Sequence, residues 1–317
     1  MRLTQFMKII KKLVILGILG ASLAVGLGFL GFIHPAFDTF SHFRLHLSIG
    51  LLIIGAIIAL REWQFLSLLA LIIGGIGFYT ASNGTLLSKR ILEADASKPV
   101  YSLLHFNLYW INSKREAVID KIIELDPDLI SLSEAATRWT FEIRRLDEKW
   151  PYLLHCPEWG KRGGIRFYSK WPLQTEGQYC GPYGSFARTQ VTAPNGLEFT
   201  SGSVHLRWPW PASGPKQLKT ITPELEKVGD HALFAGDFNA TTWSHSVNQF
   251  AEASQMQVVS GVGPTWMIDE LPLYYTWWAG LPIDNVMKKG RIEVLSANTL
   301  EDMGSDHLPV MVKFQIK

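Results

Sequence analysis

The chain has 317 residues, of which 47% are apolar and only 18% are charged, against about 25% charged residues in typical soluble domains. This composition excludes a disordered chain, and two cysteines exclude both a disulfide-rich scaffold and a four-cysteine zinc site. The net charge of +2 conceals a division, since residues 1–90 carry 8 Lys or Arg against 2 Asp or Glu, whereas residues 91–317 carry 22 against 26.

A basic, apolar first part before a mildly acidic remainder predicts a membrane anchor followed by a water-soluble domain. Residues 13–33 contain no charge and, as a helix, would cross a hydrocarbon core of about 30 Å. This run exceeds the apolar region of about 7–15 residues in a cleavable signal peptide. Two more apolar runs follow, so we expect three transmembrane helices at 13–33, 43–60 and 64–81. The alternative is one span followed by a buried helical hairpin.

The distribution of basic residues predicts the orientation of this anchor, which occupies residues 1–81. Four of them precede the first span: Arg2, Lys8, Lys11 and Lys12. By the positive-inside rule the N-terminus is cytoplasmic. Three spans then place the remainder on the periplasmic or extracellular side of the plasma (inner) membrane, whereas two spans would leave it in the cytoplasm. We interpret residues 82–98 as a linker and residues 99–317 as the water-soluble domain.

Strands and helices alternate after the linker. Residues 101–107 and 129–133 are β-rich and apolar, and between them apolar residues recur at helical spacing around 118–123. Further strands are expected at 164–169, 186–192, 197–206, 232–235, 283–287, 292–297 and 310–314, and further helices near 216–228, interrupted by Pro223, and 244–254. Many strands with few helices indicate a two-sheet α/β or α+β sandwich.

The predicted helix around residues 118–123 has recognisable end signals. Ser113 and Glu116 match the capping-box pattern at its start, and Asp126-Pro127 ends it. The resulting strand–helix–strand unit places Asn107 and Glu134 at equivalent strand ends.

Polar residues able to bind a metal ion or phosphate follow several of the apolar strands. They are Asn107 in HFN, Glu134 in SLSEA, His205 in SVHL, Asp237 and Asn239 in AGDFNA, Asp284 in PIDNV, and Asp306 and His307 in GSDHLP. Strand ends at one edge of a sheet form a rigid scaffold on which such side chains converge. Each motif alone also fits an ordinary solvated residue, turn or structural histidine, but their joint order is hard to obtain by accident.

This set of residue types suits phosphate-ester hydrolysis. Glu134 and Asp306, supported by Asn107, offer hard oxygen ligands for Mg²⁺ or Mn²⁺. Asp237 can orient or deprotonate the attacking water, and Asn239 can donate to a phosphoryl oxygen.

A histidine and its carboxylate partner complete the expected chemistry. A histidine can protonate the leaving oxygen, and Asp284 can fix the tautomer of that histidine.

On these motifs, residues 99–317 resemble the endonuclease/exonuclease/phosphatase superfamily of metal-dependent phosphodiesterases, which includes deoxyribonuclease-type nucleases, abasic-site endonucleases, neutral sphingomyelinases and inositol-polyphosphate phosphatases. GDFN and GSDHLP are the most specific segments. The resemblance implies a four-layer α/β sandwich of two packed β-sheets flanked by helices. It further implies that Asn107, Glu134 and Asp306 lie at the metal, that His205 and His307 form the catalytic histidine pair with Asp284 beside His307, and that Asp237 and Asn239 serve the nucleophile and phosphate.

The chain departs from the superfamily pattern at two positions. Tyr109 stands where some relatives have an acidic residue, and Asn285 stands where many have His or Tyr, which weakens the case for a second metal ion. Two pairs, Thr265-Trp266 and Thr276-Trp277, resemble its Thr-aromatic motif, and the sequence alone does not distinguish them.

We therefore expect a membrane-anchored, divalent-metal-dependent hydrolase of phosphate esters, a phosphodiesterase of nuclease type. The alternative is a lipid or small-molecule phosphoesterase, sphingomyelinase- or phosphatase-like, acting near the membrane, and a third reading is a non-catalytic binding protein. The expected partners are a phosphate-ester substrate (nucleic acid, phospholipid or small phosphodiester) and the lipid bilayer, and no protein partner is inferable. The acidic balance of residues 91–317 argues mildly against nucleic acid, whereas the membrane tether favours lipid.

Secondary features carry open alternatives. Cys156 and Cys180 would pair in an oxidising compartment, but we expect two unpaired buried thiols. Three arginines, Arg166, Arg188 and Arg207, would serve either phosphate binding or surface ion pairs. The tryptophans near the motifs (Trp208, Trp210, Trp277 and Trp278) would stack on bases, enter the membrane interface or pack ordinarily.

Overall fold

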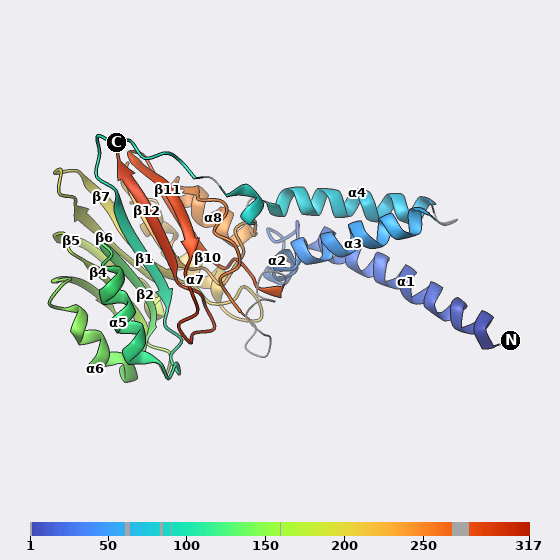
Figure 1. Cartoon of the computed structure of the whole chain (residues 1–317), viewed down its shortest axis with the longest axis horizontal. Helices are drawn as coiled ribbons and strands as arrows, with labels where there is room; N and C mark the ends of the chain where they lie inside the picture. The colour runs from blue at the N-terminus through green and yellow to red at the C-terminus, as the bar shows by residue number, and fades with distance from the viewer. Residues whose placement is uncertain (1, 61–63, 83–84, 90, 159, 268–278) are drawn as a thin grey trace. The chain divides into compact units, whose positions relative to one another are not determined.

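A computed structural model describes the chain except residues 1, 61–63, 83–84, 90, 159 and 268–278 (Figure 1). Contacts divide it into two compact units. The first comprises Met1–Asn83 with Trp243–His245, and the second comprises Gly84–Thr242 with Ser246–Lys317.

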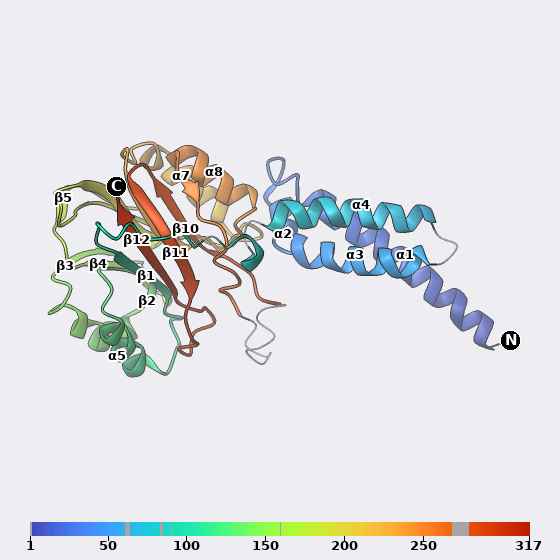
Figure 2. The same cartoon turned by 45° about the horizontal axis from the view of Figure 1, so that its top comes forward.

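The first unit is helical (Figures 1 and 2). Its helices are α1 (Arg2–Leu27), α2 (Pro35–His42), α3 (Arg44–Ala59) and α4 (Gln64–Ala81). Within the described residues, the helical segment Gln5–Leu27 and α4 are long and apolar enough to cross a membrane, and α2 with α3, bent by 57°, would form a third span. The described part of the chain thus holds two or three candidate spans.

The first helix differs from the predicted span at 13–33, because it begins at Arg2 and ends at Leu27. A Cβ on Gly28 would lie 3.0 Å from the Ser41 main-chain nitrogen, so a side chain there would crowd the neighbouring backbone. Pro35 then starts α2, and His34 Nδ1 accepts a hydrogen bond from Ala36 N–H at 3.2 Å. The chain therefore turns where the sequence suggested a continuous apolar helix.

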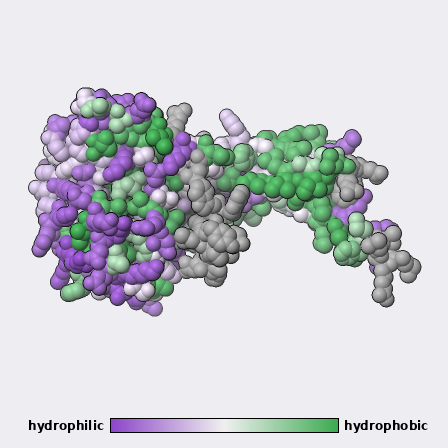
Figure 3. All heavy atoms as spheres, viewed as in Figure 1, coloured by the Kyte–Doolittle hydropathy of each residue, from purple (hydrophilic) through white to green (hydrophobic). Residues whose placement is uncertain are grey.

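Small residues let α3 and α4 pack closely. A Cβ on Gly55 would lie 3.0 Å from Leu71, and one on Gly74 would lie 3.0 Å from the Ser48 carbonyl oxygen. The outward faces remain apolar (Figure 3), and seven large side chains of α3 and α4 are more than half exposed: Ile53, Ile57, Phe65, Leu68, Ile72, Ile76 and Tyr79. Exposed apolar faces of this kind mark surfaces that a membrane or another protein covers.

The second unit contains two six-stranded sheets. One has the order β11-β12-β1-β2-β4-β3 and the other β5-β6-β7-β8-β10-β9. The strands are β1 (Tyr101–Asn107), β2 (Leu129–Ala135), β3 (Tyr152–Cys156), β4 (Gly164–Ser169), β5 (Leu173–Cys180), β6 (Phe186–Thr192), β7 (Glu198–His205), β8 (Ala232–Asp237), β9 (Gln257–Val258), β10 (Asp284–Lys289), β11 (Ile292–Thr299) and β12 (Val310–Ile316). Each sheet has one parallel pair at its centre, β1 with β2 and β7 with β8.

Three apolar layers hold these sheets together. Side chains such as Leu103, Phe167, Phe199 and Leu233 are buried between the sheets. A second layer packs one sheet against α5 (Arg115–Leu125) and α6 (Thr140–Ile143), and a third packs the other sheet against α7 (Gly214–Leu225) and α8 (His245–Ser254). The views agree that these helix pairs flank the strands (Figures 1 and 2). The predicted four-layer α/β sandwich is confirmed.

Two local predictions for helices are wrong. Helix α5 is preceded by Lys114, without a side-chain capping bond, because Asn112 Oδ1 accepts from Lys114 N–H at 2.8 Å and organises this turn in place of Ser113. Helix α7 passes through Pro223 and ends at Leu225, so the proline lies in the last turn and removes a single hydrogen bond. Asp126 does end α5, in the left-handed conformation with φ 48°.

Part of the segment predicted as a linker packs on the second unit. Leu92 N–H donates to the Leu295 carbonyl at 3.1 Å, and the Gln315 side-chain amide donates to the carbonyls of Asp95 and Lys98, each at 2.9 Å. These bonds attach the segment to β11 and β12.

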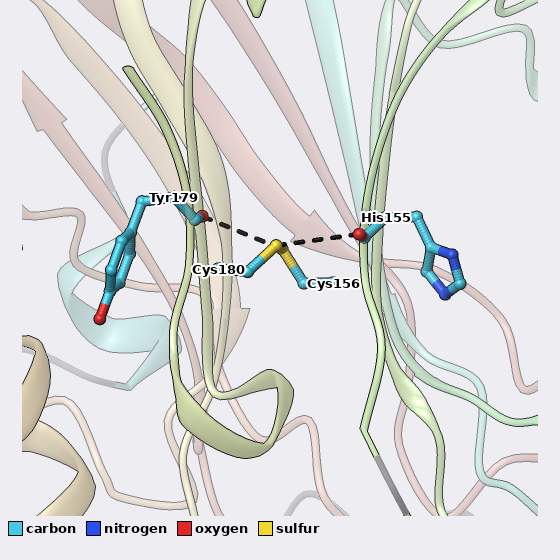
Figure 4. Close-up of a disulfide and its surroundings, with 4 residues drawn as sticks. All are labelled: His155, Cys156, Tyr179 and Cys180. Atoms are coloured by element: carbon cyan, nitrogen blue, oxygen red, sulfur yellow. Dashed lines mark hydrogen bonds between the residues drawn. A yellow bond between two sulfur atoms is a disulfide. The ribbon is translucent and has the colours of Figure 1, made fainter. Parts of the chain in front are cut away.

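The two cysteines form a disulfide, so the prediction of unpaired thiols is wrong. Cys156 ends β3 and Cys180 ends β5, which are edge strands of different sheets. Their Cα atoms lie 5.3 Å apart, within bridging distance, and Figure 4 shows the bond beside the main-chain oxygens of His155 and Tyr179. A proximity that arises only from stacking two sheets leaves no signal in the spacing of the cysteines.

We expect this disulfide to stabilise the second unit. Closing a loop between cysteines separated by 24 positions removes entropy from the unfolded chain and contributes about 3 kcal/mol. A Cys156→Ala/Cys180→Ala chain in detergent should therefore unfold at lower urea concentration than the wild type, measured by tryptophan fluorescence.

Reduction of the wild type with dithiothreitol provides the matched control. Reduction should lower the urea midpoint of the wild type to that of the double variant and leave the midpoint of the double variant unchanged. Equal unfolding midpoints for wild type and double variant would contradict a stabilising role.

Candidate active site

The eight predicted site residues gather at one edge of the sandwich. Parallel pairing puts the ends of β1 and β2, and of β7 and β8, at the same edge, and the register places His205 beside Asp237. Asp284 begins β10 opposite Asp237. Asn239 follows β8, and Asp306 and His307 precede β12. Asn239 and Asp306 are half-buried, and the other six are buried: Asn107, Glu134, His205, Asp237, Asp284 and His307.

Asp237 lies at the centre of the group. Its Oδ2 accepts from the side-chain amides of Asn107 and Asn239, each at 3.0 Å, and its Oδ1 accepts from Asn239 N–H at 2.8 Å. The Nε2 atoms of His205 and His307 each lie 3.8 Å from Oδ2. Burial raises the pKa of Asp237 to about 7, against the opposing charge of His307 and the amide bonds.

Asp284 is held between two imidazoles. His307 Nδ1 lies 2.8 Å from Oδ2, and His105 Nε2 lies 2.9 Å from Oδ1. Burial alone would raise the pKa of Asp284, but His307 and His105 hold it well below its usual value. Burial would likewise lower the pKa of His307, but the charges of Asp284 and Asp237 raise it to about 10. His307 is therefore a cation at neutral pH.

His105 is a site residue that the sequence interpretation missed. Its Nδ1 lies 3.0 Å from Ser131 Oγ, which donates to Ser203 Oγ at 2.7 Å. His105 precedes Asn107 by two positions in β1, so both side chains point to the same face. The sequence did contain a signal for this residue: a histidine inside an apolar strand, two positions before Asn107 and therefore on the same face.

His205 has the opposite electrostatic character to His307. Burial lowers the pKa of His205 to about 3, and the charges of His307 and Arg162 act in the same direction. Its Nε2 lies 3.9 Å from Glu134 Oε1. At neutral pH the site thus combines a neutral and a charged imidazole.

Glu134 and Asp306 form a pair of oxygen donors. Glu134 Oε2 accepts from Trp110 N–H at 3.0 Å. Burial raises the pKa of Glu134, the Trp110 bond opposes this, and the neighbouring charge of Asp306 raises the pKa further. Two carboxylates close enough to disfavour each other's ionisation are neutralised by a divalent cation, and their oxygens are the ligand type that Mg²⁺ and Mn²⁺ take. The donor set therefore fits the expected ion.

Asp237, Asp284 and His307 also lie close enough together to hold an ion, with potential ligand atoms within 4.8 Å of one another. Both Asp284 oxygens and His307 Nδ1 are already engaged in hydrogen bonds. Binding a cation through those atoms would break the bonds.

Three residues at this edge adopt the left-handed backbone conformation, which is uncommon outside glycine. The φ angles are 57° at Tyr109, 53° at Glu134 and 47° at Asn239. Such residues cost about 1–3 kcal/mol each and persist where surrounding structure fixes them. A break in register between Leu132 and Ala135 accommodates Glu134. The turns direct side chains from strand ends into the site.

The departure from the superfamily pattern at Asn285 has a local explanation. Asn285 Nδ2 donates to the carbonyl of Ala240 at 2.9 Å, and its Oδ1 accepts from Thr242 at 2.9 Å, so it braces the segment after Asn239.

The structure distinguishes the two Thr-aromatic pairs. Thr265 Oγ1 accepts from Asp284 N–H at 3.1 Å, and Trp266 forms an isolated antiparallel β-bridge with His307. The pair Thr265-Trp266 thus lies at the site, whereas Thr276-Trp277 and Trp278 lie outside the described residues.

The three arginines have different surroundings. Arg188 is buried with Glu224 at 2.7 Å, and Arg166 Nη1 lies 3.5 Å from the Tyr168 hydroxyl. Arg207 lines a cavity of about 730 Å³ that also reaches His205 and Asn239. Trp208 lines the same cavity, and Trp210 is exposed.

Solved structures share this fold. D. rerio TDP2 in complex with a single-strand DNA product matches at 14% identity with a TM-score of 0.55, covering 69% of this chain and 99% of that one. A Bacteroides thetaiotaomicron endonuclease/exonuclease/phosphatase family protein matches at 12% identity with a TM-score of 0.55, covering 69% and 99%. The human nocturnin catalytic domain with bound sulfate matches at 14% identity with a TM-score of 0.53, covering 74% and 100%. No curated protein matches significantly.

The family model described as Endonuclease/Exonuclease/phosphatase family matches residues 104–307. This range exceeds half of the chain and contains all eight predicted site residues. The chain therefore belongs to the endonuclease/exonuclease/phosphatase family and is a hydrolase of phosphate esters.

Proposed function

We propose that the chain is a membrane-anchored, divalent-metal-dependent phosphodiesterase of nuclease type. The observation that carries this proposal is the convergence of buried carboxylates, amides and imidazoles on Asp237, with hydrogen bonds of 2.8–3.0 Å from Asn107 and Asn239. A buried set of this kind is costly to maintain without a chemical role.

Glu134 and Asp306, supported by Asn107, would hold Mg²⁺ or Mn²⁺. When bound, the ion supplies positive charge that stabilises the phosphoryl oxygens in the transition state. The Trp110 N–H bond leaves Glu134 Oε1 as the donor oxygen on the side of His205.

The remaining residues divide the work of proton transfer and orientation. Asp237 orients and deprotonates the attacking water, and Asn239 donates to a phosphoryl oxygen. His307, held by Asp284 through Nδ1, presents Nε2 toward the reacting centre and protonates the leaving oxygen. His205, neutral beside Asp237, hydrogen-bonds the phosphoryl group.

The alternative substrate is a phospholipid or a small phosphate ester. The exposed apolar faces of α3 and α4 favour it, because a membrane tether brings the site close to lipid head groups. The DNA product bound to the structurally similar D. rerio TDP2 supports the nuclease type, as does the cavity beside His205 and Asn239, whose walls include basic and aromatic residues.

We further propose that the catalytic domain lies on the periplasmic or extracellular side of the plasma (inner) membrane. Three spans with a cytoplasmic N-terminus give this orientation. The Cys156–Cys180 bond supports it, because structural disulfides persist mainly in oxidising compartments.

The full chain in detergent should hydrolyse bis-p-nitrophenyl phosphate with Mg²⁺ or Mn²⁺, stop with EDTA and recover when the metal is restored. Asp237→Asn should lower kcat by about 10²–10⁴-fold, because the amide does not accept the water proton. Asp230→Asn, the same change at an exposed position, is the control and should keep wild-type activity. Activity indifferent to chelation would remove the metal role.

His105→Phe should lower kcat about 10–100-fold with a smaller effect on KM, because Asp284 loses one of the two partners that fix its orientation. His105→Gln keeps a donor for Asp284 and should recover part of the rate. Equal kcat in the Phe variant, the Gln variant and the wild type would show that His105 is only part of the packing.

An alkaline phosphatase reporter, active only outside the cytoplasm, tests the topology. Fused after Lys317 it should be active, and fused after Leu60 it should be inactive, because that point follows the second span. Activity only in the Leu60 fusion would invert the orientation.

A further inference from the structure

The cavity of about 730 Å³ beside His205 and Asn239 has walls of a distinct chemical type. Three basic and two aromatic side chains line it: Lys161, Arg162, Arg207, Tyr183 and Trp208. Glu158 is the acidic residue among its described lining. The neighbouring catalytic edge instead concentrates carboxylates. The two regions therefore attract different groups, a cation at the carboxylates and an anion in the cavity.

Two neighbouring residues orient the Arg207 side chain, which is 46% exposed. Its guanidinium lies 5.3 Å from the Tyr183 ring centroid, and its Nη2 lies 3.4 Å from Glu158 Oε1. Its main-chain N–H donates to Gln217 Oε1 at 2.8 Å. A guanidinium that is already partly oriented binds a phosphate with less entropic cost.

Arg162 extends the positive charge of the cavity toward the catalytic edge. It is exposed, and its charge acts on both Glu134 and His205. The next residue, Gly163, has φ 80°, and a Cβ there would lie 2.4 Å from the backbone of Ala136. The turn that carries Arg162 is thus pressed against the segment that follows Glu134.

The disulfide joins the two segments that lead into the walls of the cavity. Cys156 precedes the loop that carries Lys161 and Arg162, and Cys180 precedes the turn Pro182–Gly184 that carries Tyr183. A Cβ on Gly184 would lie 3.0 Å from the Gly164 Cα and 3.2 Å from the Cys156 carbonyl oxygen, so the backbones of the two segments meet directly. Basic and aromatic side chains are therefore presented by a rigid support.

We propose that this cavity binds a second, non-scissile phosphate of a nucleotide substrate, with the adjoining base stacked on Tyr183. This proposal rests on the proposed phosphodiesterase function and names its substrate class. Three cations suit a phosphate, and the volume is within the range of about 300–1,000 Å³ that small-molecule sites occupy. Tyr183 is 63% exposed, which leaves its ring available to a base, and such stacking with nearby arginines is typical of single-strand binding.

The binding test uses the full chain in detergent, in EDTA, so that it does not depend on catalysis. Calorimetry with thymidine 5′-phosphate should show binding to the wild type, and Arg162→Ala/Arg207→Ala should weaken it by roughly tenfold or more per arginine. Tyr183→Ala should weaken thymidine 5′-phosphate but not inorganic phosphate. Lys313→Ala removes an exposed cation on β12, outside the cavity lining, and is the charge-matched control.

The kinetic test compares substrates that differ by one phosphate. The dinucleotide pTpT should have at least tenfold higher kcat/KM than TpT in the wild type, and the double arginine variant should lose this ratio while Lys313→Ala keeps it. Vesicles of phosphatidylglycerol and phosphatidylglycerol phosphate form the lipid pair. A gain confined to the lipid pair would overturn the nucleotide assignment.

The two tests fail separately. Thymidine 5′-phosphate binding that depends on the arginines, without hydrolysis of any diester, would overturn the proposed function and leave the phosphate site standing. Hydrolysis with equal binding and equal ratios in wild type and folded variants would overturn the phosphate site alone. Circular dichroism and tryptophan fluorescence establish that each variant is folded.

Discussion

The confinement of four carboxylates at one edge of the sandwich is the constraint on which the site depends. Charges removed from water must be paired or neutralised, or they destabilise the fold. Asp284 lies between the imidazoles of His105 and His307, and Asp237 accepts three amide hydrogen bonds. Glu134 and Asp306 form a second pair of carboxylates: one Glu134 oxygen accepts the Trp110 N–H, and the charge of Asp306 disfavours the ionised form of Glu134. A divalent cation held by this pair would offset the repulsion between the two carboxylates.

The architecture explains how residues distant in sequence reach one another. Each sheet contributes a central parallel pair, so polar residues that end apolar strands meet at a shared edge. The apolar layer between the sheets fixes the distance between the polar residues of one sheet and those of the other. The same stacking brings Cys156 and Cys180 together at another pair of strand ends and supports the basic cavity. One packing arrangement thus positions carboxylates and cations in adjoining regions.

Most of what could be predicted from the sequence came from two features: the alternation of strand-like and helical segments, and the polar residues that follow apolar strands. The strands at 164–169 and 186–192 have the predicted limits, because both segments are rich in aromatic and β-branched residues and are bounded by turns. The edge strand β5 escaped detection since its sequence is polar and its pairing irregular. His105 was missed because a polar residue inside an apolar strand gains meaning only from Asp284, which lies 179 positions away. The left-handed conformations of Tyr109 and Glu134 were equally hidden, because they arise from the tertiary packing and not from local preference.

The helical unit and the hydrolase domain depend on different physical constraints. Among the described residues, two or three helices have the length and apolarity that a bilayer requires of a spanning helix, whereas the site depends on specific contacts between side chains. Titration of the full chain with Mn²⁺, followed by electron paramagnetic resonance, tests the central claim most directly. We expect one bound ion per chain, with affinity lost in Glu134→Gln and retained in His105→Phe. Undiminished binding by Glu134→Gln would contradict the assignment of the cation to the Glu134–Asp306 pair.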